Sequence, residues 1–301
     1  MREIIHPKSM DETCERYVKD LKFIIDRERK FPQNKPVLML SGGVDSFMLG
    51  ALAKKYYGLE RSITVGVKKD SKDIIVSQDT ASKLGITNEL IFITLEEVID
   101  NLHLCKGKGG FIGVTNVFSL IYYLVFYLCL KQTDIREVDL LQGDGADTLL
   151  GSIQTFMYAQ SPSVMEKLDI DKDTAKTVLK QRFYVKAIDP NKKSYKGAGH
   201  LFLELAKELG ANPIMPFKHS DVIRWVNDLY YGFSRPDKKL LHKKFIEYLG
   251  YDPKKVKRGI MQIETGIYKT IQDHMMQITG ANSPNAGVVK YLNGGRALPG
   301  L

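Results

Sequence analysis

Apolar runs of strand length alternate with longer amphipathic stretches through the first half of the chain. The runs predict buried strands, and the stretches, whose apolar residues recur at helical spacing, predict helices. The predicted strands are 37–40, 62–67, 89–93 and 138–142, and the predicted helices are 8–31, 44–57, 73–84, 95–101 and 115–131. Because strands that alternate with helices form a parallel, doubly wound sheet, we expect an α/β fold with flanking helices. Ligands of such sheets bind at the carboxyl ends of the strands.

A glycine-rich turn follows the first predicted strand, where residues 41–46 read SGGVDS. Gly42 and Gly43 let the backbone turn sharply and approach a ligand closely. The helix that follows offers N–H groups without helical partners and the positive end of its dipole, and both attract phosphate. Asp45 would repel phosphate unless Mg²⁺ lay between them, since Mg²⁺ takes carboxylate and phosphate oxygens together. The turn therefore predicts a phosphate and Mg²⁺ site; a plain glycine turn is the alternative.

A second turn of this kind, GDGADTLLGS, directly follows the strand at 138–142. Its glycines again permit a close backbone approach, and Asp144 and Asp147 place two carboxylates at a strand end. If the two strands are neighbours in the sheet, Asp147 and Asp45 could hold one Mg²⁺ across a triphosphate. The alternative is a turn whose carboxylates cap the following helix.

Composition narrows the class of protein only modestly. A hydrophobic content of 44% and a charged content of 26% are those of a globular chain. The three cysteines are far apart and form no C-x-x-C motif, which argues against a disulfide framework and a zinc site and favours a reducing compartment. The first residues lack the apolar core of a signal peptide, and the most apolar stretch, 117–130, is short for a membrane span. We therefore expect a cytoplasmic protein with no membrane partner.

The net charge of +9 is spread over the chain, with basic residues concentrated at 238–244 and 254–258. Such charge can attract nucleic acid, serve an ATP site or cover a solvated surface, so a nucleic-acid partner stays an alternative. His200, His219 and His242 have no metal-ligand spacing and are predicted to be ordinary polar residues.

Three segments together resemble the synthetase domain of asparagine synthetases and their relatives, including β-lactam synthetase, in the ATP pyrophosphatase superfamily. These are SGGVDS at 41–46, VGV at 65–67 and QGDGADT at 142–148, in the order and spacing of the family's Ser-Gly-Gly-Leu/Val-Asp-Ser, Val-Gly and Ser-Gly-Glu-Gly-Ser-Asp-Glu motifs. Segments similar to the family's Val-Pro-Phe-Leu-Asp, Lys-x-x-Leu-Arg and Arg-x-Lys-x-Gln-x-x-x-Gly motifs follow at 212–229, 235–250 and 257–267.

The resemblance implies an adenine nucleotide α-hydrolase-like fold with a helical C-terminal part. It places a synthetase domain at 36–275, between a helical lead-in at 1–35 and a flexible Gly/Pro/Asn-rich tail at 276–301. The implied activity is that of an AMP-forming ligase, which uses ATP and Mg²⁺ to adenylate a carboxylate or carbonyl oxygen and passes the product to ammonia or another amine. Activation of a nucleobase or nucleic acid, and a nucleotide sensor without activity, are the alternatives.

The resemblance also implies a role for each position that matches a family motif. The residues implied to contact the phosphates are Ser41, Gly42, Gly43, Asp45 and Ser46. The adenosine pocket would be formed, largely by backbone atoms, by Leu40, Val65, Gln142 and Gly143. Mg²⁺ binding is assigned to Asp45 and Asp147. Lys238 would contact the phosphates or neutralise the leaving pyrophosphate.

Departures from the family motifs concern the catalytic residues first. Asp144 stands at the family's Glu and is one methylene shorter. The family's late Lys aligns with Ile260, so that either Lys257 or Arg258 replaces it or the chemistry differs.

Other departures concern the substrates. Arg2 stands where the family's amidotransferases carry the glutaminase Cys. We therefore expect the amine to be free ammonia, ammonia supplied by a partner, or a different amine. The family's Thr-Thr-Ile-Arg segment reads TNVF at 115–118, and the loss of its Arg argues against aspartate as the acid.

Overall fold

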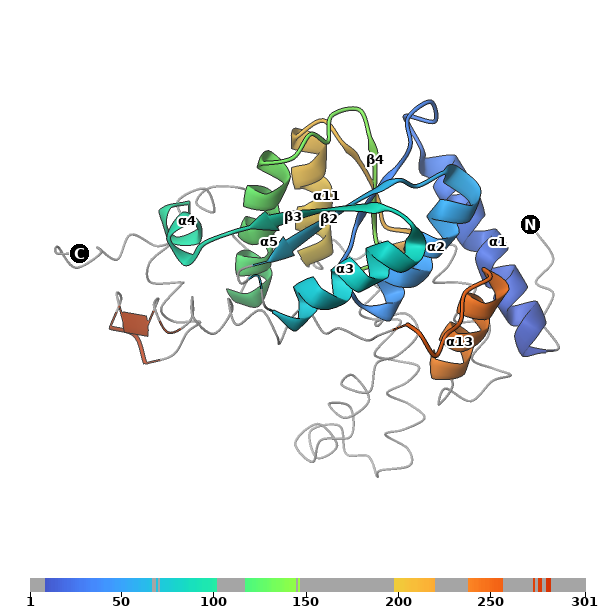
Figure 1. Cartoon of the computed structure of the whole chain (residues 1–301). Helices are drawn as coiled ribbons and strands as arrows, with labels where there is room; N and C mark the ends of the chain where they lie inside the picture. The colour runs from blue at the N-terminus through green and yellow to red at the C-terminus, as the bar shows by residue number, and fades with distance from the viewer. Residues whose placement is uncertain are drawn as a thin grey trace, which may run out of the picture.

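The computed structural model describes residues 9–66, 69, 71–101, 117–144, 146, 198–219, 238–256, 273, 276–277 and 280–282. Within them the fold is built on a parallel sheet of five strands in the order β3-β2-β1-β4-β5 (Figure 1). The strands are β1 (Val37–Met39), β2 (Arg61–Gly66), β3 (Thr87–Phe92), β4 (Asp139–Gln142) and β5 (Asn212–Ile214). The four predicted strands are confirmed, and β5 is a strand that the sequence did not predict.

Helices connect the strands and continue after β5. They are α1 (Met10–Glu28), α2 (Val44–Tyr57), α3 (Lys72–Leu84), α4 (Leu95–Asp100), α5 (Val117–Lys131), α11 (Ala198–Glu208), the short 3₁₀-helix η3 (Pro216–Lys218) and α13 (Lys238–Tyr248). The predicted helices are confirmed with small changes at their ends. Among the described helices, none combines the length and the hydropathy that a bilayer span requires.

Side chains alternate between the two faces of the sheet along each strand, and β1, β2, β4 and β5 are buried on both faces, whereas the edge strand β3 is only half-buried. Leu38 and Leu141 pack in one apolar cluster with residues of α1, α2, α3 and α13. Met39 and Leu140 pack in a second cluster with residues of α4, α5 and α11, and Figure 1 shows α5 and α11 side by side, away from α1 and α13. This arrangement confirms the doubly wound α/β class with flanking helices.

The N-terminal helix α1 is a full member of the first cluster. Its predicted apolar stripe is buried, with Tyr17, Leu21 and Ile25 at 0% exposure. The ring of Tyr17 meets the ring of Phe245 on α13 edge to face, with the ring centroids 5.5 Å apart. Each such buried apolar side chain contributes roughly 1.5–3 kcal/mol. The helices α1 and α13, which lie far apart in the sequence, are therefore joined through one core.

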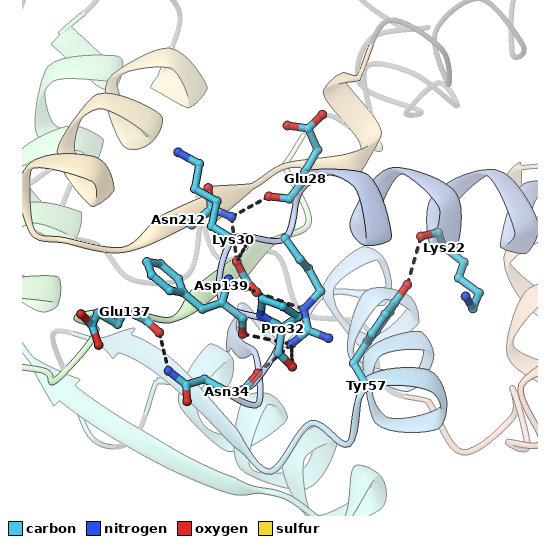
Figure 2. A network of polar contacts seen from close by, with 11 residues as sticks. Lys22, Glu28, Lys30, Pro32, Asn34, Tyr57, Glu137, Asp139 and Asn212 are labelled. Carbon is cyan, nitrogen blue, oxygen red and sulfur yellow. Dashed lines mark hydrogen bonds and ion pairs between the residues drawn. The ribbon is translucent and has the colours of Figure 1, made fainter.

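A buried carboxylate joins the end of α1 to the start of β4 (Figure 2). Asp139, the first residue of β4, is 0% exposed and accepts from Arg29 Nε at 3.0 Å and from the backbone N–H of Lys30 at 3.0 Å. The side-chain amide of Asn212 on β5 donates to Asp139 Oδ1 at 2.7 Å and to the backbone carbonyl of Glu28 at 2.7 Å. We call these residues, 28–30, 139 and 212, the Asp139 clamp.

Arg29 extends the clamp into the loop before β1. Its Nη2 donates to the backbone carbonyls of Phe31, Pro32 and Asn34, the last at 2.7 Å. Because Asp139 and Asn212 begin their strands, the clamp lies at the amino edge of the sheet. It therefore fixes α1, β4 and β5 without occupying the carboxyl edge.

The described cysteines, Cys14 and Cys129, are both buried thiols without a disulfide. Burial raises the pKa of each thiol to about 12, so both stay protonated and unreactive at neutral pH. Cys105 lies outside the described residues.

Candidate functional site

The order of the sheet reverses at β1, with β2 and β3 on one side and β4 and β5 on the other. Ligands of doubly wound sheets bind in the crevice outside the carboxyl ends of the strands at such a switch point. Met39 of β1 is paired with Gln142 of β4, so both strands end at the same level. The condition set by the sequence, that these strands be neighbours, is met, and the two glycine turns lie at one edge.

The first turn, residues 41–46, is held in shape by its own hydroxyl groups. We call it the serine–glycine loop. Ser41 Oγ and Ser46 Oγ are 3.1 Å apart, and Ser46 Oγ donates to the carbonyl of Gly43 at 2.9 Å. Gly42 has a φ of 70°, a conformation that side chains other than glycine rarely adopt. Gly43 caps α2 without a side chain, so the first N–H groups of α2 are not covered by a capping side chain.

The second turn presses directly against the first. A Cβ atom on Gly143 would lie 3.2 Å from the backbone nitrogen of Ser46 and 3.3 Å from its Cα. A side chain at this position would push the two backbones apart by a few tenths of an ångström. The serine–glycine loop and the start of the turn after β4 therefore form one wall of backbone.

The residues assigned to the adenosine pocket are buried beside this wall. Leu40, Val65 and Gln142 are 2%, 6% and 6% exposed. The backbone N–H of Leu40 donates to Ile63 at 2.8 Å, and its carbonyl accepts from Thr64 Oγ1 at 2.8 Å, so the main chain of Leu40 is already bonded to β2. The buried Oε1 of Gln142, in contrast, meets no donor among the described residues. Leaving such an acceptor unpaired costs about 1–3 kcal/mol, which a ligand N–H or O–H would recover.

An ion pair and a close contact between a histidine and a carboxylate bring further residues to the carboxyl edge. Asp144, at the second turn, pairs with Lys218 of η3, which follows β5; their side chains are 40% and 35% exposed. Asp45, in the first turn of α2, lies with Oδ1 3.3 Å from Nε2 of His242 on α13. The sequence analysis did not name Lys218, and it did not assign His242 to the site. His242 had been predicted to be an ordinary polar residue, yet its position against Asp45 leaves it only 5% exposed.

A cavity of about 330 Å³ adjoins the His242 contact. It lies between Val44 at the start of α2, His242 and Ile246 of α13, and the turn at 253–256. Lys243 and Lys254 line it as well, so its mostly apolar wall carries two cations.

Several predicted site residues fall outside what the structure describes. Asp147, Lys257 and Arg258 lie outside the described residues, and so do Ile260 and most of the predicted tail. Lys238 is the first residue of α13, four positions before His242, and its side chain is not among those described. Among the described residues, no three His, Cys, Asp or Glu side chains form a metal-binding group. An oxygen-liganded cation held by one or two carboxylates and by phosphate needs no such group.

The chain was compared with known proteins. A family model described as asparagine synthase matches residues 29–226. No curated protein matches the chain. Among solved structures, the U34-tRNA thiolase NcsA from Methanococcus maripaludis with its [4Fe-4S] cluster aligns with 94% of this chain and 78% of its own, at 17% identity and a TM-score of 0.35. The family match spans every strand from β1 to β5 and both glycine turns. The chain therefore belongs to the asparagine synthase family, within the ATP pyrophosphatase superfamily.

Proposed function

We propose that this protein is an AMP-forming ligase that adenylates a carboxylate or carbonyl oxygen and transfers the product to ammonia or another amine. Family membership supports an ATP-using enzyme of the ATP pyrophosphatase type. The observation that carries the proposal is the contact of Gly143 with the backbone of Ser46, which joins two glycine turns at the switch point of the sheet. The unpaired Oε1 of Gln142 adds a buried acceptor that suits a nucleotide N–H or O–H group.

In the proposed reaction, a substrate oxygen attacks the α-phosphorus of ATP and the bond from that phosphorus to pyrophosphate breaks. Negative charge then grows on the pyrophosphate. The N–H groups that begin α2 are fixed before the reaction, so they would stabilise this charge without rearranging. The hydroxyls of Ser41 and Ser46 donate within the loop and would have to rotate to donate to the phosphates. Lys238 is proposed to neutralise the same charge. An amine then attacks the activated carbon and AMP leaves.

Asp45 and Asp147 are the residues proposed to hold Mg²⁺. The Asp45 carboxylate lies in the first turn of α2 and is 22% exposed, and hard carboxylate oxygens are the ligands that this ion prefers. When bound, Mg²⁺ would offset the negative charge of the phosphate oxygens. The remaining catalytic proposals are Asp144, which Lys218 holds beside the second turn, and Lys257 or Arg258 in place of the family lysine. We also infer a cytoplasmic location, because unbridged thiols suit a reducing compartment.

The identity of the nucleotide formed from ATP tests this proposal. Purified protein is incubated with ATP, Mg²⁺, ammonia or an amine, and a panel of carboxylic acids, and the nucleotides are separated by chromatography. We expect acid-dependent formation of AMP and pyrophosphate in equal amounts. Formation of ADP and phosphate without AMP would overturn the proposal.

The basic helix α13 favours a second candidate, in which the activated oxygen belongs to a nucleobase or nucleic acid. Its first seven residues include Lys238, Lys239, Lys243 and Lys244. This candidate predicts that AMP formation needs RNA or DNA and that binding to the polymer weakens steeply as salt rises. A protein that neither polymer retains at low salt would exclude it.

A methyl group at Gly143 is expected to weaken ATP binding. In Gly143→Ala the new Cβ would meet the Ser46 backbone at about 3.2 Å, so the two turns must move apart. Overpacking of this kind costs about 1–3 kcal/mol, and we expect the Kd for ATP with Mg²⁺ to rise about tenfold, measured by calorimetric titration.

Gly58→Ala is the matched control for this substitution. Gly58 ends α2 with a φ of 65°, and no atom lies within 4 Å of its hypothetical Cβ. The control strains the backbone at the other end of α2, so it is expected to lower stability and leave ATP affinity unchanged. Equal ATP affinity in both variants and the wild type would contradict a nucleotide site at Gly143.

A further inference from the structure

The contact between His242 and Asp45 connects the C-terminal helix α13 to the serine–glycine loop. Nε2 of His242 lies 3.3 Å from Oδ1 of Asp45, and the imidazole is 5% exposed. We propose that His242 is a positioning residue, which fixes the orientation of the Asp45 carboxylate toward the bound cation. This inference rests on the proposed function, in which Asp45 binds Mg²⁺.

The packing of α13 does not itself require an imidazole at this position. Phe245, Ile246 and Leu249 already bury the apolar side of the helix, at 0%, 3% and 6% exposure. A buried polar group costs free energy unless it meets a partner, and an apolar residue at 242 would avoid that cost. The imidazole is directed instead at a carboxylate on another helix. Its presence is therefore better explained by what it does to Asp45 than by the packing of α13.

The position of Asp45 in the folded protein does not depend on the contact with His242. An acidic residue in the first turn of a helix is already favoured by the helix dipole. The Asp45 side chain keeps 22% of its surface exposed, so an ion in the crevice could still reach it. Hydrogen-bonded partners that orient a metal-binding carboxylate are the usual second layer of a metal site.

The imidazole is held firmly enough to act in this way. Phe245, three residues on, packs edge to face on Tyr17 of α1 with ring centroids 5.5 Å apart. The helix is thereby anchored in the core, and the imidazole approaches Asp45 from a fixed direction. Mg²⁺ prefers oxygen ligands, so His242 is assigned to the carboxylate and not to the ion.

The test compares ATP binding with Mg²⁺ and ATP binding in EDTA, both by calorimetric titration of the full chain. Loss of such an orienting partner typically costs about 10–100-fold in metal affinity. We expect His242→Ala to reduce the ratio of the two ATP affinities about 10–100-fold while affinity in EDTA stays the same. His242→Gln should restore most of the ratio, because its side-chain amide can donate to the Asp45 carboxylate. Glu247→Gln, on an exposed residue of the same helix that does not line the cavity, should leave the ratio unchanged.

Each other outcome has a distinct meaning. An unchanged ratio in His242→Ala, or an equal loss with and without Mg²⁺, would overturn the positioning role. If His242→Ala does not fold, His242→Leu keeps the volume of the side chain and is measured in its place. If ATP binding by the wild type is indifferent to Mg²⁺, the proposed metal site fails and the role of His242 fails with it.

Discussion

Replacing Asp45 by asparagine is expected to reduce AMP formation by about 10²–10³-fold, the size of loss seen when one fixed stabiliser of transition-state charge is removed. Asparagine keeps the shape of the side chain but lacks the charge that attracts Mg²⁺ to the phosphates. The fold should persist, because the substituted atom lies on a partly exposed side chain in the first turn of α2. AMP and pyrophosphate release at saturating ATP, together with a thermal melt, measures both effects.

A carboxylate on another helix provides the control for Asp45. Asp79→Asn removes a charge from α3 that pairs with Lys83 one turn away, and AMP formation should not change. Asp147→Asn is expected to behave as Asp45→Asn does, since both carboxylates are proposed for the same ion. Near-normal activity in either the Asp45 or the Asp147 variant would contradict the proposed metal site.

Replacing Asp139 by alanine is expected to lower the free energy of unfolding by about 3–5 kcal/mol, the usual cost of breaking a buried ion pair. The Arg29 side chain is 10% exposed and would lose its counter-charge, while the Lys30 N–H and the Asn212 amide would lose an acceptor. Chemical denaturation should report this change, and Tm should fall by about 10 °C.

A double-mutant cycle makes the Asp139 prediction specific. Removing both charges, as in Arg29→Met with Asp139→Leu, should destabilise the protein less than the sum of the two single changes. The exposed pair of Lys19 and Glu15 is the reference, because solvent-screened pairs contribute about 0–1 kcal/mol. A loss below about 1 kcal/mol in Asp139→Ala would show that the clamp does not stabilise the fold.

The strands β1 to β4 and the two glycine turns could be predicted because each is encoded locally. An apolar run, a glycine turn and a helix follow one another within about 20 residues at the serine–glycine loop. The strand β5 could not be predicted, because Asn212–Ile214 is three residues long and contains Pro213. Proline is tolerated in a strand at the edge of a sheet, and β5 is such an edge strand. Its position depends on tertiary pairing with β4.

The polar contacts of the site could not be predicted from the sequence, for a related reason. His242 lies in the sequence KKLLHKKF, which has the pattern of a solvated basic face, and its burial follows from the packing of α13 against α1. Lys218 reaches Asp144 from a segment 74 residues later in the chain. Asp139 did leave a signal, a charged residue at the start of an apolar strand, but its partner Arg29 lies 110 residues away. Contacts of this range are set by the fold and not by local pattern.

The strand order has a consequence for synthesis on the ribosome. The strands β1, β2 and β3 are complete by Phe92 and can pair early, whereas Gln142, the partner of Met39, is made about 100 residues after it. In a nascent chain that ends before β4, the second glycine turn does not yet face the serine–glycine loop. The proposed ATP site would be incomplete, so ATP binding could not stabilise the folded chain at this stage. The open side of β1 would meanwhile present unpaired N–H and C=O groups, which invite pairing with other chains. During translation, that strand edge is where we expect a chaperone to bind.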